Sequence, residues 1–184
     1  MKSLIAIGVL TLSVGTAAAQ RAVTFEISPQ VMGEINVTTD SSRGWLPTAD
    51  QRQKALRTAE RFLGSLEAGR YGDAYGMQTA INMRNQSRTE FIAEAEKFRT
   101  IAGPLKFWRV SKMTWTKDPA RAPLPGIYAA IDLVAAFANV DRDCSYMVLF
   151  RPRPTAISRS SAARTTTWTT RQRARSRRRS RRPM

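Results

Sequence analysis

The sequence has no histidine and a single cysteine among its 184 residues. Without histidine it lacks the side chain that most often transfers protons near neutral pH and most often binds zinc. One cysteine forms no internal disulfide and, without histidine, no cysteine–histidine nucleophile pair. The phosphate-binding patterns G-x-x-x-x-G-K-[ST] and G-x-G-x-x-G are also absent. We therefore predict no catalytic residue, no cofactor and no metal site, although carboxylate or arginine catalysis stays open.

The one cysteine, Cys144, belongs to the apolar run CSYMVLF, which is typical of a β-strand. A lone thiol in an exported protein is either buried or available for an intermolecular disulfide. Free cysteine is among the residue types most often found in protein interiors, so we expect Cys144 to be buried.

Acidic residues are scarce, and none lies in the last part of the chain. The formal charge is +16, from 30 Lys and Arg against 14 Asp and Glu. Twelve of the basic residues and none of the acidic ones lie from Arg151 on, which leaves residues 1–150 with a charge of only +4. Without a leader and a tail, about 130 residues remain, enough for one small domain.

Residues 1–19 have the pattern of a secretory signal peptide. In MKSLIAIGVLTLSVGTAAAQ a lysine precedes an uncharged apolar run that ends in three alanines. The run is too short to span a bilayer, so we predict cleavage between Ala19 and Gln20 and a periplasmic or secreted product without a transmembrane segment. No cysteine follows the cleavage site, which disfavours a lipid anchor. We expect the turn-rich residues 20–46 to form a loosely held arm.

Three helices are predicted after this arm. Thr48 and Gln51 have the spacing of a capping box, and Gly69 supplies a helix stop. A short second helix follows with Asp73 as its cap, and the Ser87-Arg88-Thr89-Glu90 capping box opens a third that Gly103-Pro104 ends. The apolar stripe of the first helix comprises Ala55, Leu56, Ala59, Phe62, Leu63 and Leu66, and that of the third comprises Phe91, Ala95, Phe98 and Ala102.

Extended sequence follows, with strands starting near Leu105, Gly126 and Cys144. Helices first and strands afterwards indicate an α+β domain over residues 47–150. It would have two to three N-terminal helices packed on one face of an antiparallel meander of three or four strands. In the second strand the face expected under the helices comprises Ile127, Ala129, Ile131, Leu133, Ala135 and Phe137.

This order of elements resembles a family of small exported bacterial proteins catalogued as domain of unknown function 4019. The resemblance covers roughly residues 50–150 and rests on AERFLGSLEAGRYGDAY, the helix that contains Phe91, and PGIYAAIDLVAAF. It implies a compact periplasmic or secreted domain and offers no reaction to transfer. A weaker similarity, at the level of fold, links the pattern to domains like nuclear transport factor 2. The family pattern continues with another apolar strand after residue 150, and this chain departs from it there.

The segment from 151 to 184 contains 12 Arg, 6 Thr, 5 Ser, 4 Ala and 3 Pro, with no lysine. Selected polybasic arms usually mix lysine with arginine, whereas GC-rich DNA translated out of frame is rich in these five residues. We interpret the tail as a frameshift product, or alternatively as a native basic tail. In both cases we expect it to be disordered. As a frameshift product it would also leave the CSYMVLF edge unpaired, or paired only poorly by tail residues. The predicted non-specific polyanion contacts are Arg171, Arg173, Arg175, Arg177, Arg178, Arg179, Arg181 and Arg182.

Polar residues near the sheet and the helix ends are the candidates for a ligand site. We predict an ion pair between Asp132 and Arg109, because an unpaired carboxylate among apolar neighbours is costly to bury. The plainer interpretation of this pair is structural. The candidate site residues are Tyr71, Tyr75, Arg109, Tyr128 and Asp132.

Three functions stay open. The first is a non-enzymatic binding or structural role in the cell envelope, with an unidentified partner or small ligand. The second is a small-molecule-binding or catalytic domain like nuclear transport factor 2, which a deep pocket lined by Asp132 and Arg109 would support. The third is non-specific binding of nucleic acid or an anionic surface through the tail.

Overall fold

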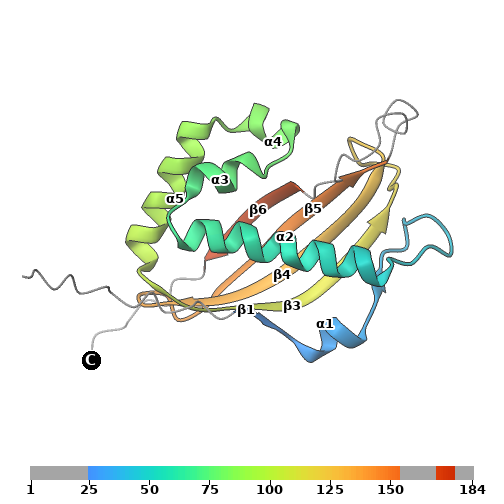
Figure 1. Cartoon of the computed structure of the whole chain (residues 1–184), viewed down its shortest axis with the longest axis horizontal. Coiled ribbons are helices and arrows are strands. Elements are labelled where there is room, and N and C mark those ends of the chain that lie inside the picture. The colour runs from blue at the N-terminus through green and yellow to red at the C-terminus, as the bar shows by residue number, and fades with distance from the viewer. Residues whose placement is uncertain (1–24, 154–168, 177–184) are drawn as a thin grey trace, which may run out of the picture.

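The computed structural model describes residues 25–153 and, as backbone, residues 169–176 (Figure 1). The proposed signal peptide at residues 1–19 and its cleavage site lie outside the described residues. So do residues 154–168 and 177–184 of the tail. Within the described parts, the chain folds as an α+β domain whose main helices precede the long strands, as predicted.

Helix α2 spans Ala49–Glu67 and begins with the predicted capping box. The Gln51 backbone N–H donates to Thr48 Oγ1 at 3.2 Å, and the Thr48 N–H donates to Gln51 Oε1 at 2.9 Å. The helix ends before Gly69, whose φ of 70° lies in the left-handed region that side chains disfavour. The predicted stripe faces the sheet: four of its members are buried and two are partly buried, namely Ala55, Ala59, Phe62 and Leu63, then Leu56 and Leu66.

Three shorter helices follow: α3 (Tyr71–Gly76), α4 (Ala80–Asn85) and α5 (Arg88–Ala102). The predicted Ser87–Glu90 capping box starts α5. The prediction that Asp73 caps α3 is wrong. Asp73 lies in the first turn of the helix and pairs with Arg70 at 3.4 Å. Helix α4 was not predicted, because none of its six residues is buried and so it has no apolar stripe to show a helical period.

The predicted strands are β3 (Leu105–Lys117), β4 (Gly126–Phe137) and β5 (Asp143–Pro152). They pair in antiparallel fashion in chain order, as a meander. The helix-facing side of β4 is the predicted one: Ala129, Ile131, Leu133, Ala135 and Phe137 are buried and Ile127 packs at the margin.

The arm is more ordered than predicted. Strands β1 (Phe25–Ile27) and β2 (Asn36–Val37), separated by helix α1 (Pro29–Gly33), both pair in parallel with β3. The sheet is therefore mixed rather than a pure antiparallel meander. The physical reason is that the free edge of β3 offers backbone donors and acceptors that even a short polar segment can satisfy.

The tail also contributes a strand. β6 (Thr169–Ser176) pairs antiparallel with β5, from Phe150 opposite Thr169 to Asp143 opposite Ser176. For these eight residues the prediction of disorder is wrong. Of the two outcomes expected for the β5 edge, unpaired or paired by tail residues, the structure has pairing by tail residues. The backbone hydrogen bonds of a strand pair do not require apolar side chains, so the polar composition of the tail could not exclude a strand. Whether the segment arises from a frameshift stays a prediction, which the reading frame of the gene tests.

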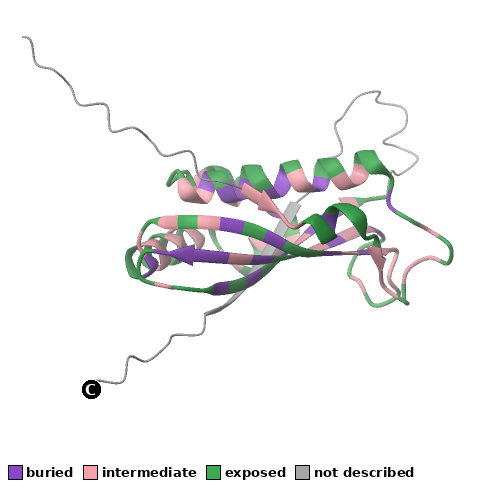
Figure 2. Cartoon of the chain, turned by 90° about the horizontal axis from the view of Figure 1, so that it is seen from below, coloured by how far each residue is buried: buried purple, intermediate pink, exposed green. Residues whose placement is uncertain are grey.

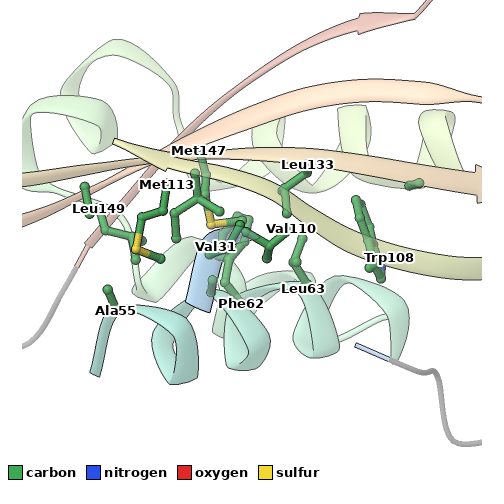
Figure 3. Packing of buried hydrophobic residues seen from close by; sticks show 14 of the residues in the cluster. Val31, Ala55, Phe62, Leu63, Trp108, Val110, Met113, Leu133, Met147 and Leu149 are labelled. Atoms are coloured by element: carbon green, nitrogen blue, oxygen red, sulfur yellow. The ribbon is translucent and has the colours of Figure 1, made fainter. Parts of the chain in front are cut away.

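The core lies between α2 and the inner face of the sheet, as Figure 2 shows by the buried residues on the facing sides of both layers. Phe62 and Leu63 of α2 point toward Val110, Leu133 and Met147 of three adjacent strands (Figure 3). Among the described residues no helix is long and apolar enough to cross a membrane.

Cys144 is exposed, so its predicted burial is wrong. Side chains alternate along β5, and Asp143, Ser145 and Met147 are buried against the helix layer. Cys144 must therefore face outward. The run CSYMVLF is apolar at consecutive positions, so the sequence alone does not show which alternate set faces inward.

Candidate functional site

A cavity of about 240 Å³ lies where the helices meet one end of the sheet. It is bounded by the end of α2, the start of α3, one side of α5 and three strands. Helix α5 turns its apolar stripe toward this space, and of that stripe only Ala102 is fully buried. The lining residues are Leu66, Glu67, Tyr71, Gln86, Phe91, Glu94, Ala95, Phe98, Arg99, Trp108, Phe137 and Asp143.

Three aromatic rings form one wall of the cavity. The Phe137 ring centroid lies 5.2 Å from that of Phe98 and 5.7 Å from that of Trp108, with interplanar angles of 86° and 85°. These are edge-to-face contacts, which hold each ring in a defined orientation. The wall is therefore apolar and ordered before any ligand arrives.

The sheet places one donor and one acceptor at this wall. Cross-strand register puts Trp108 opposite Ala135, and Ala135 opposite Asp143. The three side chains share the inner face, and the small Ala135 separates the two polar ones. Trp108 is 5% exposed and Asp143 is 2% exposed. Trp108 Nε1 and Asp143 Oδ1 both lack a hydrogen-bond partner within the part of the chain that the structure describes.

Burial raises the pKa of the Asp143 carboxyl, because removal from water disfavours the charged form. The neighbouring Ser145 hydroxyl acts in the opposite direction. Neither Ser145 Oγ nor Asp143 Oδ1 completes a hydrogen bond among the described residues. The Ser145 hydroxyl therefore lowers the pKa of Asp143 less than burial raises it. Asp143 is thus a buried acid with unused hydrogen-bonding capacity.

Charged side chains stand at the margin of the cavity. Arg99 of α5 donates to Glu67 of α2 and forms an ion pair that joins the two helices. This hydrogen bond is the main reason that the pKa of Arg99 is raised. Glu94 accepts a hydrogen bond of 2.7 Å from Gln86 Nε2. Arg99, Glu67 and Glu94 therefore already have partners, in contrast to Asp143 Oδ1.

Of the predicted site residues whose side chains the structure describes, Tyr71 alone lines the cavity. Tyr75 lies behind it and acts as a structural tether. Its hydroxyl donates to the Gln86 carbonyl oxygen at 3.0 Å, and its ring lies 5.7 Å from that of Phe91, which lines the cavity. Tyr75 therefore fixes the α4–α5 turn and does not meet the cavity itself.

The predicted pair of Asp132 and Arg109 does not form. Asp132 lies opposite Lys112, and Arg109 lies opposite Val134, with an irregularity in β3 between the two positions. Arg109 instead pairs with Glu26 of β1, through contacts of 2.8 and 2.9 Å. The prediction failed because it did not include β1, which supplies the nearer carboxylate.

Tyr128 is also separate from the cavity, since its hydroxyl donates to the Leu124 carbonyl oxygen at 2.6 Å in the preceding loop. Arg109, Tyr128 and Asp132 alternate with inward residues and so lie on the face of the sheet away from α2. Of the eight tail arginines predicted to contact polyanions, three lie in β6 and five lie outside the described residues: Arg171, Arg173 and Arg175, then Arg177, Arg178, Arg179, Arg181 and Arg182.

Sequence reasoning missed Asp143 and Trp108 as site residues. The available indication was alternation: Asp143 is two positions before Ser145 and four before Met147, so all three share a face. Placing an acid on the face that also carries Met147 predicts a buried carboxylate.

Comparison with known proteins found no matching family model, no matching curated protein and no matching solved structure. The resemblance to domain of unknown function 4019 therefore stays a prediction. In the described part of the chain, no group of three or more cysteine and acidic side chains could hold a metal ion.

Proposed function

We propose that this domain binds a small, mostly apolar molecule in the cavity beneath α5, without catalysing a reaction, after export to the periplasm or the medium. The observation that carries the proposal is the pair of buried, unpartnered polar atoms, Trp108 Nε1 and Asp143 Oδ1. An unsatisfied buried polar atom costs about 1–3 kcal/mol, and a ligand with complementary atoms removes this cost.

The size of the cavity limits the ligand. An apolar cavity of about 150 Å³ is enough to bind benzene, and drug-sized ligands occupy roughly 300–1,000 Å³. At about 240 Å³ this cavity suits one ring with a short substituent. The aromatic wall supplies apolar contact, and the two unpartnered atoms supply orientation.

Export is part of the proposal and rests on the pattern of residues 1–19 alone. The type of domain proposed matches the small-molecule alternative drawn from the resemblance to nuclear transport factor 2. The residues that support it differ from those first predicted, because Asp143 and Trp108 take the places of Asp132 and Arg109.

Filling the cavity tests the proposal. Ala95 lines the cavity from α5, so Ala95→Phe places a ring inside it. Ala93, two residues earlier in the same helix, is exposed, so Ala93→Phe is the matched control. Isothermal titration of the full chain with 2-phenylethylamine, 2-phenylethanol and 3-phenylpropionate should show saturable binding of at least one probe.

Binding should be lost in Ala95→Phe and kept in Ala93→Phe. If no probe binds, or if both variants bind equally well, the proposed function is wrong. Circular dichroism shows whether Ala95→Phe is folded. If it is not, Ala95→Leu provides a smaller filling of the same space.

Polyanion binding through the tail is a second proposal, which the twelve arginines without acidic neighbours favour. Each phosphate contact lowers the logarithm of affinity by about 0.9 per decade of salt on duplex DNA. Tail binding should therefore disappear at high salt, and binding of the neutral 2-phenylethanol in the cavity should not. A salt titration with a random duplex separates the two.

A further inference from the structure

Asp143 Oδ1 is an unpartnered buried atom on the cavity lining, among the residues that the structure describes, and its charge defines a ligand chemistry. We infer that the cavity is selective for an organic amine: the ammonium group binds Asp143 and the apolar body lies against the rings of Phe98, Phe137 and Trp108. This inference rests on the proposed function and adds the charge and class of the ligand.

The chemistry of the free carboxylate oxygen calls for a cationic ligand. Asp143 Oδ1 is an acceptor in the charged state, it is buried, and no described residue donates to it. A buried carboxylate needs a cation or several hydrogen-bond donors to be stable. The nearest cation on the cavity lining, Arg99, is already paired with Glu67. A ligand ammonium supplies both the charge and up to three donors.

The charge of the described lining also favours a cation. Among the residues that the structure describes, its ionisable side chains are Glu67, Glu94, Asp143, Arg99 and the phenol of Tyr71. Three acids face one base, so with the carboxylates ionised the lining has two negative charges in excess. Anionic ligands would meet this charge in a weakly screened space, whereas cationic ligands would be attracted.

The aromatic wall of the cavity also suits a cation. The faces of Trp and Phe rings attract cations, by about 0.5–1 kcal/mol when exposed and about 2 kcal/mol or more when desolvated. Phe98, Phe137 and Trp108 lie within one edge-to-face cluster beside the carboxylate. Carboxylate and aromatic rings together form the pattern that receives amines with an apolar body.

Trp108 adds orientation. Its Nε1–H is a donor without a partner among the described residues, so an acceptor on the far side of the ligand would satisfy it. Trp108 and Asp143 lie on β3 and β5, two strand spacings apart, or about 9.5 Å between backbones. A ring with an amine at one end and an ether oxygen at the other has donor and acceptor at opposite ends.

The test compares probes of equal shape and different charge. On the full chain, 2-phenylethylamine should bind about tenfold more tightly than 2-phenylethanol, and 3-phenylpropionate should bind most weakly. Asp143→Asn should remove the preference for the amine. Asp141→Asn is the matched control, because it removes the same charge from an exposed neighbouring position and should leave the preference intact.

Equal binding of amine and alcohol, both blocked by Ala95→Phe, would overturn the inference and leave the proposed function standing. Loss of the preference in Asp141→Asn would assign it to general charge and also overturn the inference. An absence of binding by every probe would refute the proposed function itself. As a second measurement, 4-methoxyphenylethylamine should bind several-fold more tightly than 2-phenylethylamine, and Trp108→Phe should abolish that gain.

Discussion

The ion pair between Arg99 and Glu67 should couple the two helices at the margin of the cavity. Exposed ion pairs contribute about 0–1 kcal/mol, and removing one partner of a fully buried pair costs about 3–5 kcal/mol. Arg99 is 34% exposed and Glu67 is 17% exposed, so this pair lies between the two classes. We therefore expect Glu67→Gln to lower the free energy of unfolding by about 2 kcal/mol, because it leaves the Arg99 charge beside apolar groups.

A double-mutant cycle measures the coupling itself. The cycle uses urea unfolding at neutral pH of the parent, Glu67→Gln, Arg99→Gln and the double variant, and the coupling energy should be about 1 kcal/mol. The melting temperature of Glu67→Gln should fall by about 6 °C. Arg70 and Asp73 are the control pair, since they are 60% and 69% exposed and should couple by less than about 0.3 kcal/mol. Equal coupling in both pairs would refute the reasoning from burial.

Four further predictions concern the core, the sheet and Asp143. Phe62→Ala should lower the free energy of unfolding by about 3–5 kcal/mol in urea titrations, since Phe62 is 1% exposed, and a loss below 1 kcal/mol would contradict the core assignment. Gly126→Ala should cost about 3 kcal/mol by the same assay, because its Cβ would collide with the carbonyl oxygen of Arg151; a neutral effect would show a looser β4–β5 pairing. Because the pKa of Asp143 is raised in the folded state, this residue contributes stability that is present at low pH and is lost as pH rises through the folded pKa. Asp143→Asn should therefore flatten the decline of stability with rising pH in thermal melts. An unchanged decline would show that other groups cause it. A chain that ends at Arg153 removes β6 and should aggregate faster than the full chain in light scattering, because the β5 edge becomes free; equal rates would argue against the pairing.

Local rules predicted the main helices and strands well. The capping boxes at Thr48 and Ser87 are satisfied within four residues of sequence, so no tertiary information is needed to place α2 and α5. The inner face of β4 followed from strict alternation of apolar side chains. These elements carry their own boundary and face signals, which is why the α+β class could be predicted.

The edges of the sheet could not be predicted in this way. Strands β1, β2 and β6 are short, polar or arginine-rich, and they form because β3 and β5 present unpaired backbone groups. These unpaired backbone groups belong to strands that are distant in the sequence. Patterns within the segments themselves do not show them.

The site could not be predicted from the sequence for a related reason. The cavity combines residues from Leu66 to Asp143, and its two key atoms are neighbours only through the register of three strands. A one-residue error in that register moves a side chain to the opposite face. Asp132 and Arg109 were chosen as polar residues in strands, yet alternation places both on the face away from α2.

The most direct test of amine binding in the cavity is the indole N–H resonance of Trp108 in a ¹H–¹⁵N spectrum of the full chain, assigned with Trp108→Phe. Titration with 4-methoxyphenylethylamine should shift this resonance saturably, because the ether oxygen accepts from Nε1. The indole resonance of Trp45, which lies against Lys117 outside the cavity, should stay in place. A Trp108 resonance that does not move, or that moves no more than that of Trp45, would contradict the account.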